Sequence, residues 1–265
     1  MNIFTRELKA TRKSMIIWCF GVIAMVVGGM GKYAGLANSP ASLTEFMNSL
    51  PESLLNLMGM SSLDITTAMG FYGVLFLYIA IMLGIHAIML GANIIAKEEI
   101  DKTSEFLMVK PVSRKTVLTM KLLAGLVNLT ILNVISFFSS FVMVNYFSKN
   151  TSLTHDMLLL TLGLFILQLI FMSVGSLMAT IKKHSKSVGA AATGVLLISF
   201  LLSMIINMNE NLDILKYITP FKYFEATAII NGNGFELPFF LLSFVLISLC
   251  LIGTYYFYEK RDLNI

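Results

Sequence analysis

The chain has 265 residues, of which 57% are hydrophobic and only 13% charged, with a formal net charge of +4. A soluble domain has about 25% charged residues, and a soluble protein of this length could not bury so much apolar surface. The composition therefore excludes a soluble protein and predicts one for which the lipid bilayer is part of the solvent.

Six uncharged runs are long enough to cross a bilayer, which takes about 20 apolar residues in a helix. The first is short, and Lys32 could extend it by reaching toward the membrane surface. The second is too long for one span, so we expect its helix to begin near Phe71. The sequence thus predicts a single all-α transmembrane domain, residues 1–265, with six transmembrane helices. The six runs cover residues 15–31, 65–96, 122–148, 157–181, 187–209 and 237–258.

Basic residues are distributed unevenly among the connecting segments. Four lie in residues 1–14, six in 97–121, three in 182–186 and two after Tyr258, which makes 15 of the 19 lysines and arginines. Cytoplasmic loops of membrane proteins are enriched in Lys and Arg. This bias predicts a multi-pass protein of the plasma membrane with both termini in the cytoplasm. It also identifies the net positive charge as a membrane-topology signal and gives no reason to expect nucleic-acid binding.

The first run and the basic residues before it have a second interpretation. A basic start, an apolar run and the small residues of YAGLANSPA also resemble a secretory signal peptide. A membrane span is favoured because the hydrophobic region of a signal peptide has only about 7–15 residues. Residues 1–14 themselves place Ile3, Phe4 and Leu8 on one stripe, which predicts a short cytoplasmic amphipathic helix near anionic lipid headgroups. A cluster of charges that only sets topology explains them equally well.

The most charge-dense stretch, residues 97–121, separates the second and third runs. Glu98 and Lys102 are spaced i, i+4, which favours a helix that continues inward from the second span. Pro111 ends that helix, and Ser113 is well placed to cap the next one, which runs through Arg114. A docking surface on the cytoplasmic side explains the apolar residues of this stretch better than a solvated loop does. These apolar residues are Phe106, Leu107, Met108, Val109 and Val112.

This stretch resembles the signature of the membrane subunits of type-2 ATP-binding cassette (ABC) exporters. That signature runs roughly Glu-x-x-x-Gly-Thr-x-Glu-x-Leu and then Pro-x-Ser-Arg. Lys102 differs, because the common pattern has glycine at its position. The segments LPESLLNLMGM and YITPFKYFEA are also similar to outer segments of the family. The matching residues are Glu98, Thr103, Glu105, Leu107, Pro111, Ser113 and Arg114.

The resemblance implies how the protein would work. In this family the loop between the second and third spans is a coupling helix, which sits in a groove of a separate ATPase. Two ATPase subunits close on ATP and Mg, and the spans re-pack; this chain would bind no cofactor itself. A second membrane subunit, identical or related, would complete the transporter. Of the expected interface residues, Phe106, Leu107 and Val109 would supply apolar contact with the ATPase. The charged residues that would fix the register of the two proteins are Glu98, Glu99, Glu105 and Arg114. The remaining residues of the expected interface are Thr103, Pro111 and Ser113.

Two segments are expected on the outer side, residues 32–64 and 209–236. The first has Phe46, Leu50, Leu54 and Leu57 at helical spacing, which predicts one or two amphipathic helices on the membrane surface. The second is rich in aromatic and aliphatic residues and predicts a re-entrant or interfacial helical pair packed on protein. A simple interfacial anchor is the alternative reading of the second segment.

The uncharged runs bear on the class of protein and on its cargo. They contain no Asp, Glu, Lys or Arg, which disfavours an ion-coupled carrier. We expect His86 to be neutral and hydrogen-bonded between helices, and Ala190 and Gly194 to make close helix contacts. An apolar interior favours export of a hydrophobic or amphipathic peptide, drug or lipid. The main alternative is a membrane scaffold or sensor that transports nothing and whose charged loop docks another protein.

Overall fold

A computed structural model describes residues 3–37, 51, 55, 63–100, 112–148, 154–182, 187–208 and 210–260. Within these residues there are six helices long and apolar enough to cross a membrane, and there is no strand. The predicted all-α membrane fold with six spans is confirmed. The helices are α1 (Ile3–Ala37), α4 (Ala68–Ile100), α6 (Arg114–Phe147), α7 (Thr154–Ile181), α8 (Val188–Met208) and α10 (Leu237–Lys260).

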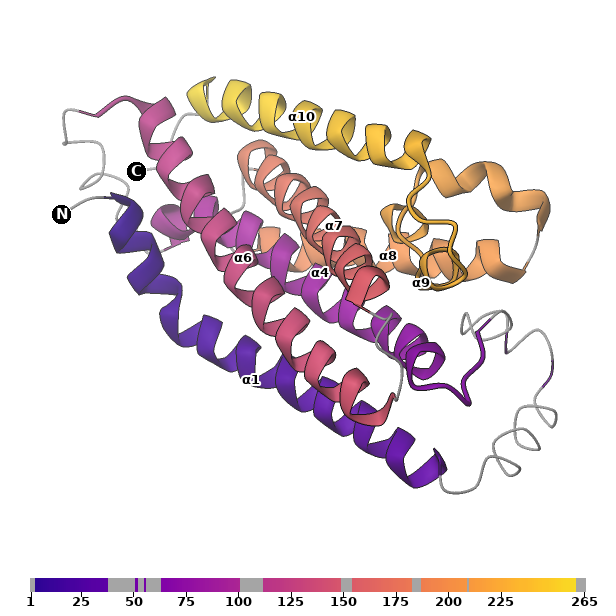
Figure 1. Cartoon of the computed structure of the whole chain (residues 1–265). Coiled ribbons are helices and arrows are strands. Elements are labelled where there is room, and N and C mark those ends of the chain that lie inside the picture. Colours follow the sequence, from indigo (N-terminus) through magenta and orange to yellow (C-terminus); the bar gives the residue numbers. More distant parts are fainter. Residues whose placement is uncertain are drawn as a thin grey trace.

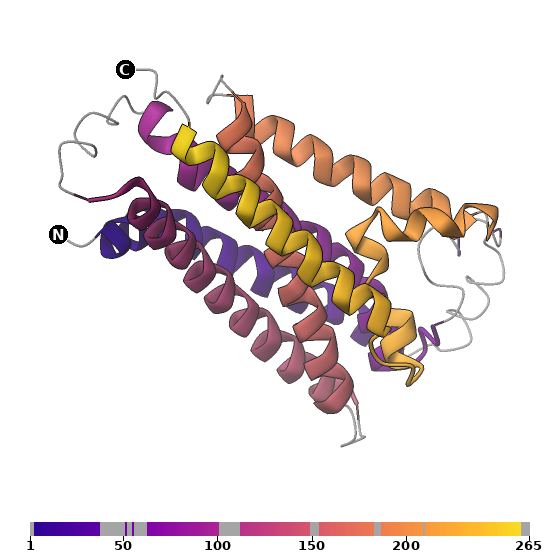
Figure 2. The same ribbon diagram turned by 90° about the horizontal axis from the view of Figure 1, so that it is seen from above.

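The helices form one bundle, with both termini at the same end (Figure 1). We call this the basic end; it comprises the first turns of α1, α6 and α8 and the last turns of α4, α7 and α10. The two central helices are α4 and α7, since 61% of the most apolar stretch of each is buried, against 17% for α10. Figure 2 shows α8 and α6 on opposite sides of the bundle, and α1 packs along α6.

Two glycines allow α4 and α7 to approach closely. A Cβ atom on Gly91 would lie 2.1 Å from the carbonyl oxygen of Met172, and one on Gly175 would lie 2.2 Å from that of Ile88. The Ser176 hydroxyl donates to the Gly91 carbonyl oxygen at 3.3 Å across the same contact. Small residues and polar groups are the usual means by which membrane helices associate. The expected close contact at Gly194 is wrong, because a Cβ atom there would meet nothing within 4 Å.

Several helix ends differ from the predicted ones. The helix α1 is continuous, so residues 3–14 form its first turns and not a separate surface helix. The helix α4 begins at Ala68, a little before Phe71, and continues past Glu98 as predicted. Ser113 caps α6 as predicted, because its hydroxyl accepts a hydrogen bond from the Thr116 backbone N–H at 3.2 Å. Residues 101–111, the centre of the predicted docking surface, lie outside the described part.

At the opposite end, residues after α8 form two 3₁₀ turns, η3 (Glu210–Tyr217) and η4 (Pro220–Lys222), and the short helix α9 (Ala226–Ile230). This segment packs on the bundle, because the Phe221 ring lies 5.2 Å from that of Phe171 and 5.5 Å from that of Phe200. Burial raises the pKa of Tyr223 to about 12, so its hydroxyl stays protonated and donates to the Tyr217 carbonyl oxygen at 2.5 Å. Most of the other predicted outer segment, residues 32–64, lies outside the described part.

Candidate functional site

Four charged side chains from three helices meet inside the basic end. Glu98 of α4 accepts a hydrogen bond from Arg6 of α1 at 2.8 Å and pairs through its other oxygen with Lys121 of α6. Lys121 also donates to the Ile94 carbonyl oxygen at 2.6 Å, and Arg6 pairs with Glu7 at 2.9 Å. We call Arg6, Glu7, Glu98 and Lys121 the buried charge cluster; it ties α1, α4 and α6 together.

Three members of the cluster lie in the protein interior, and the Arg6 side chain is 35% exposed. Lys121 has no exposed surface, and Glu7 and Glu98 are 2% and 6% exposed. Charges are buried at such sites only when opposite charges compensate them, and here two cations face two carboxylates. Glu98 and Lys121 lie just outside the uncharged runs 65–96 and 122–148. They are buried because α4 and α6 continue past these runs and bring the two opposite charges together.

The cluster lies close to the two helix ends that flank residues 101–111. Glu98 lies two residues before Ile100, where α4 ends, and Lys121 lies two turns after Arg114, where α6 begins. A displacement of the chain between these helices would reach α4 and α6 directly. It would reach α1 through Arg6, which is 92 residues from Glu98 in sequence.

A second set of contacts joins the start of α6 to the end of α10. Arg114 donates to the Glu259 carbonyl oxygen at 3.0 Å, and Lys115 lies 3.3 Å from the Glu259 carboxylate. The hydroxyls of Thr119 and Tyr255 are 2.7 Å apart one turn further along. Because the Lys115 pair is exposed, its contribution to stability is about 0–1 kcal/mol. The helix α6 thus contacts α1, α4 and α10 at the basic end.

Four of the ten residues predicted to contact an ATPase lie in the described part. Glu98 is internal and both its carboxylate oxygens are engaged, so it does not face a partner in this structure. Glu99 is half-buried, Ser113 caps α6, and Arg114 contacts α10. The grouping of Arg6, Glu7 and Lys121 with Glu98 could not be predicted from the sequence, because it depends on the tertiary packing of three helices. The six residues outside the described part are Thr103, Glu105, Phe106, Leu107, Val109 and Pro111.

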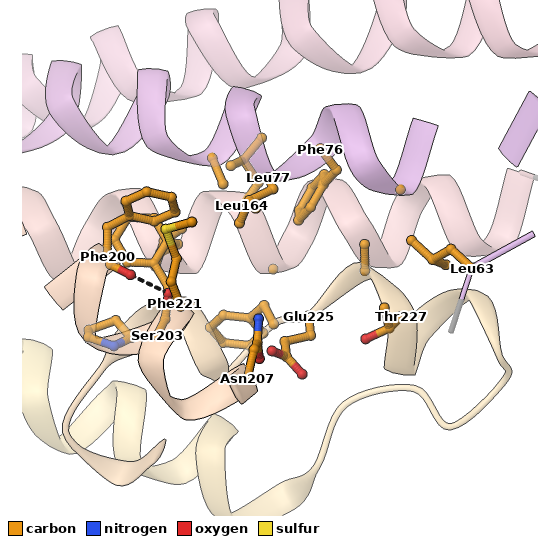
Figure 3. Close-up of a pocket in the computed structure, with 18 residues that line it drawn as sticks. Leu63, Phe76, Leu77, Leu164, Phe200, Ser203, Asn207, Phe221, Glu225 and Thr227 are labelled. Atoms are coloured by element: carbon orange, nitrogen blue, oxygen red, sulfur yellow. Dashed lines mark hydrogen bonds between the residues drawn. The ribbon is translucent and has the colours of Figure 1, made fainter. Parts of the chain in front are cut away.

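A cavity of about 60 Å³ lies at the opposite end, between α4, α7, α8 and the η4–α9 segment (Figure 3). Phe76 and Leu77 of α4 and Leu164 of α7 form its apolar side. Asn207 and Glu225 lie close together on the other side, and the Lys222 ammonium donates to both side chains. The cavity therefore has one apolar and one polar side.

Comparison with known proteins identifies the chain. The family described as ABC-2 family transporter protein matches residues 1–263, which include all six long helices, the buried charge cluster and residues 101–111. No curated protein matches the chain at a significant level. The family match covers nearly the whole sequence and agrees with the six-span fold. The chain belongs to the ABC-2 transporter family and is a non-catalytic, multi-pass membrane permease subunit.

Proposed function

We propose that a separate ATPase drives this permease through residues 101–111, the connection between α4 and α6. Permeases of this family generally work with an ATPase subunit. The observation that best supports this route is the buried charge cluster, which joins α1 to both helices that flank the connection. Phe106, Leu107 and Val109 would form the apolar part of the docking surface.

The basic end is proposed to face the cytoplasm, where ATP is available. The unequal distribution of Lys and Arg supports this orientation, because such residues are retained on the cytoplasmic side. Two ATPase copies and two membrane subunits would form the working transporter. ATP and Mg would be bound by the ATPase copies alone. When the ATPases close, the push on residues 101–111 would move α4 and α6 together, with α1 following through Arg6.

Glu98 has a different role in this proposal from the one its sequence position suggests. Its carboxylate would hold α1 and α6 against α4, while Glu99, Glu105 and Arg114 would set the register of the docked ATPase. Thr103, Pro111 and Ser113 would shape the backbone of the connection. Ser113 already does so by capping α6.

The cargo is proposed to be a hydrophobic or amphipathic molecule, such as a peptide, drug or lipid, moved outward. Support comes from the cavity at the opposite end, whose apolar side faces the polar pair Asn207 and Glu225. Its volume of about 60 Å³ is well below the roughly 300–1,000 Å³ of pockets that enclose a drug-sized ligand. Passage of such a cargo would require α4, α7 and α8 to separate there, which is the re-packing that ATP would drive.

The double variant Glu105→Lys/Leu107→Ala tests the docking surface. Loss of an apolar anchor and reversal of a charge in an interface costs at least about 2 kcal/mol, so we expect association with the ATPase to weaken about 30-fold or more. The measurement is ATPase activity and co-purification of the complex in lipid nanodiscs. Glu236→Lys/Leu237→Ala makes the same chemical changes at exposed positions of the opposite end and should leave both unchanged. Full coupling in the Glu105/Leu107 variant would contradict the proposed docking surface.

A further inference from the structure

A groove of about 380 Å³ runs along the outside of the bundle between α1 and α6. Its volume lies within the roughly 300–1,000 Å³ of pockets that bind small molecules. Only Arg12 and Asn128 among its lining residues are polar. The apolar lining includes Leu8, Ile16, Phe20 and Ile23 of α1 and Val127 and Ile131 of α6.

The groove opens on the outer surface of the bundle. Ile16 and Phe20 are 49% and 72% exposed, and Ile131 across the groove is 43% exposed. In a protein that spans a membrane, exposed apolar side chains of this kind are suited to contact with the hydrocarbon of the bilayer. Arg12 and Ile23 are eleven positions apart, about 16 Å along a helix at 1.5 Å per residue. This matches one leaflet, which is half of a hydrocarbon core about 30 Å thick.

One end of the groove carries the positive charge of Arg12. Arg12 is exposed and makes no hydrogen bond or ion pair with any side chain in the described ranges. The carboxylate of the nearby Glu7 is already paired with Arg6. Lys9, one turn before Arg12, and Lys13, the next residue in the chain, are exposed as well and add to the positive potential.

The floor of the groove is held in place by Asn128. Its side-chain amide donates to the Thr11 hydroxyl of α1 at 3.1 Å and to the Ala124 carbonyl oxygen of α6 at 3.0 Å. These bonds fix α1 against α6 one residue from Arg12. The charged end and the apolar part of the groove are therefore parts of one preformed site.

We propose that this groove binds one anionic glycerophospholipid from the leaflet at the basic end. An acyl chain lies along Phe20, Ile23 and Ile131, and the guanidinium of Arg12 binds the phosphate, a group that arginine contacts with two parallel hydrogen bonds. The lipid is a resident one that fills the seam between α1 and α6, and the site does not depend on the ATPase. Basic residues at a membrane surface each contribute about 1 kcal/mol to binding of anionic lipid, which is about fivefold in affinity.

The test uses the full chain in mild detergent with equal amounts of phosphatidylglycerol and phosphatidylcholine of identical acyl chains. Native mass spectrometry then counts the lipids retained by each variant. We expect one phosphatidylglycerol retained in preference to phosphatidylcholine, and about a fivefold lower preference in Arg12→Gln. Lys13→Gln removes the same charge from an exposed position that does not line the groove and should change the preference less than twofold. Arg12→Lys should keep most of it.

A second variant separates the groove from general charge attraction. Ile131→Trp fills the apolar part of the groove and should abolish retention of both lipids, although it leaves Arg12 intact. Equal retention of the two lipids by the unaltered chain, or equal losses in Arg12→Gln and Lys13→Gln, would overturn the proposal. So would retention of phosphatidylglycerol by Ile131→Trp.

Cys19 lines the groove and is a free cysteine. It can therefore be used to test whether a second copy of the chain, and not a lipid, occupies the groove. In a Cys250→Ser background, mild oxidation in native membranes should leave the chain monomeric on a non-reducing gel, because lipid occupies the groove. A disulfide-linked dimer through Cys19 would assign this face to a protein interface and overturn the lipid site.

Discussion

Replacing Lys121 with methionine is expected to lower the free energy of unfolding by about 3–5 kcal/mol, the usual cost of removing one partner of a buried ion pair. Lys121 is fully buried, and its loss leaves the Glu98 carboxylate inside the bundle with Arg6 as its remaining cationic partner. Methionine keeps most of the side-chain volume, so the loss reports on charge and not on a cavity. Unfolding of the purified chain by a denaturing detergent measures the change.

Lys115→Met is the matched control for this prediction. It removes the same side chain from the same helix, but Lys115 pairs with Glu259 at the surface, where such a pair contributes only about 0–1 kcal/mol. The double variant Glu98→Gln/Lys121→Met should regain most of the stability, because it removes both members of the buried pair. Equal effects of Lys121→Met and Lys115→Met would mean that the buried charge cluster does not hold the basic end together.

Gly175→Ala is expected to destabilise the bundle by about 3 kcal/mol, the upper end of what overpacking usually costs. The new Cβ atom would stand 2.2 Å from the Ile88 carbonyl oxygen, a backbone atom that cannot rotate away. The helices α4 and α7 would have to separate along the central contact of the fold. Thermal unfolding in detergent and the ATPase activity of the complex should both record the loss.

Gly194→Ala makes the same change where a Cβ atom meets nothing within 4 Å. Alanine favours a helix over glycine by about 1 kcal/mol, so this control should be neutral or slightly stabilising. If the two alanine variants behave alike, the close approach of α4 and α7 is not what sets stability.

The residues altered in these variants illustrate which features can be predicted from the sequence and which cannot. Runs of apolar residues locate all six spans because the bilayer imposes a minimum length on each helix. They do not locate Glu98 and Lys121 inside the bundle, because a charge next to an apolar run looks the same whether it faces water or a partner helix. Gly175 and Gly194 are equally small in sequence, and only the crossing of α4 and α7 distinguishes them.

Local structure is easier to predict from the sequence than tertiary contacts are. Ser113 caps α6 because its position before a helix-forming run is sufficient to specify the hydrogen bond. The sequence could not show whether residues 1–14 form a separate helix or the start of the first span. A change from polar to apolar residues does not require a break in a helix, and α1 is continuous through it. The sequence does not distinguish Arg12 from Arg6, Lys9 and Lys13, and of these four only Arg12 lines the groove beside α6.

A separate ATPase is proposed to drive this permease through the connection between α4 and α6. The decisive experiment places a photo-activated crosslinking residue at position 107, in intact cells that express the complete transporter, with position 237 at the opposite end as the control. We expect an adduct with a nucleotide-binding subunit from position 107 and none from position 237. Absence of that adduct, or modification of a cysteine placed at position 107 by a reagent that cannot enter the cell, would refute the proposal.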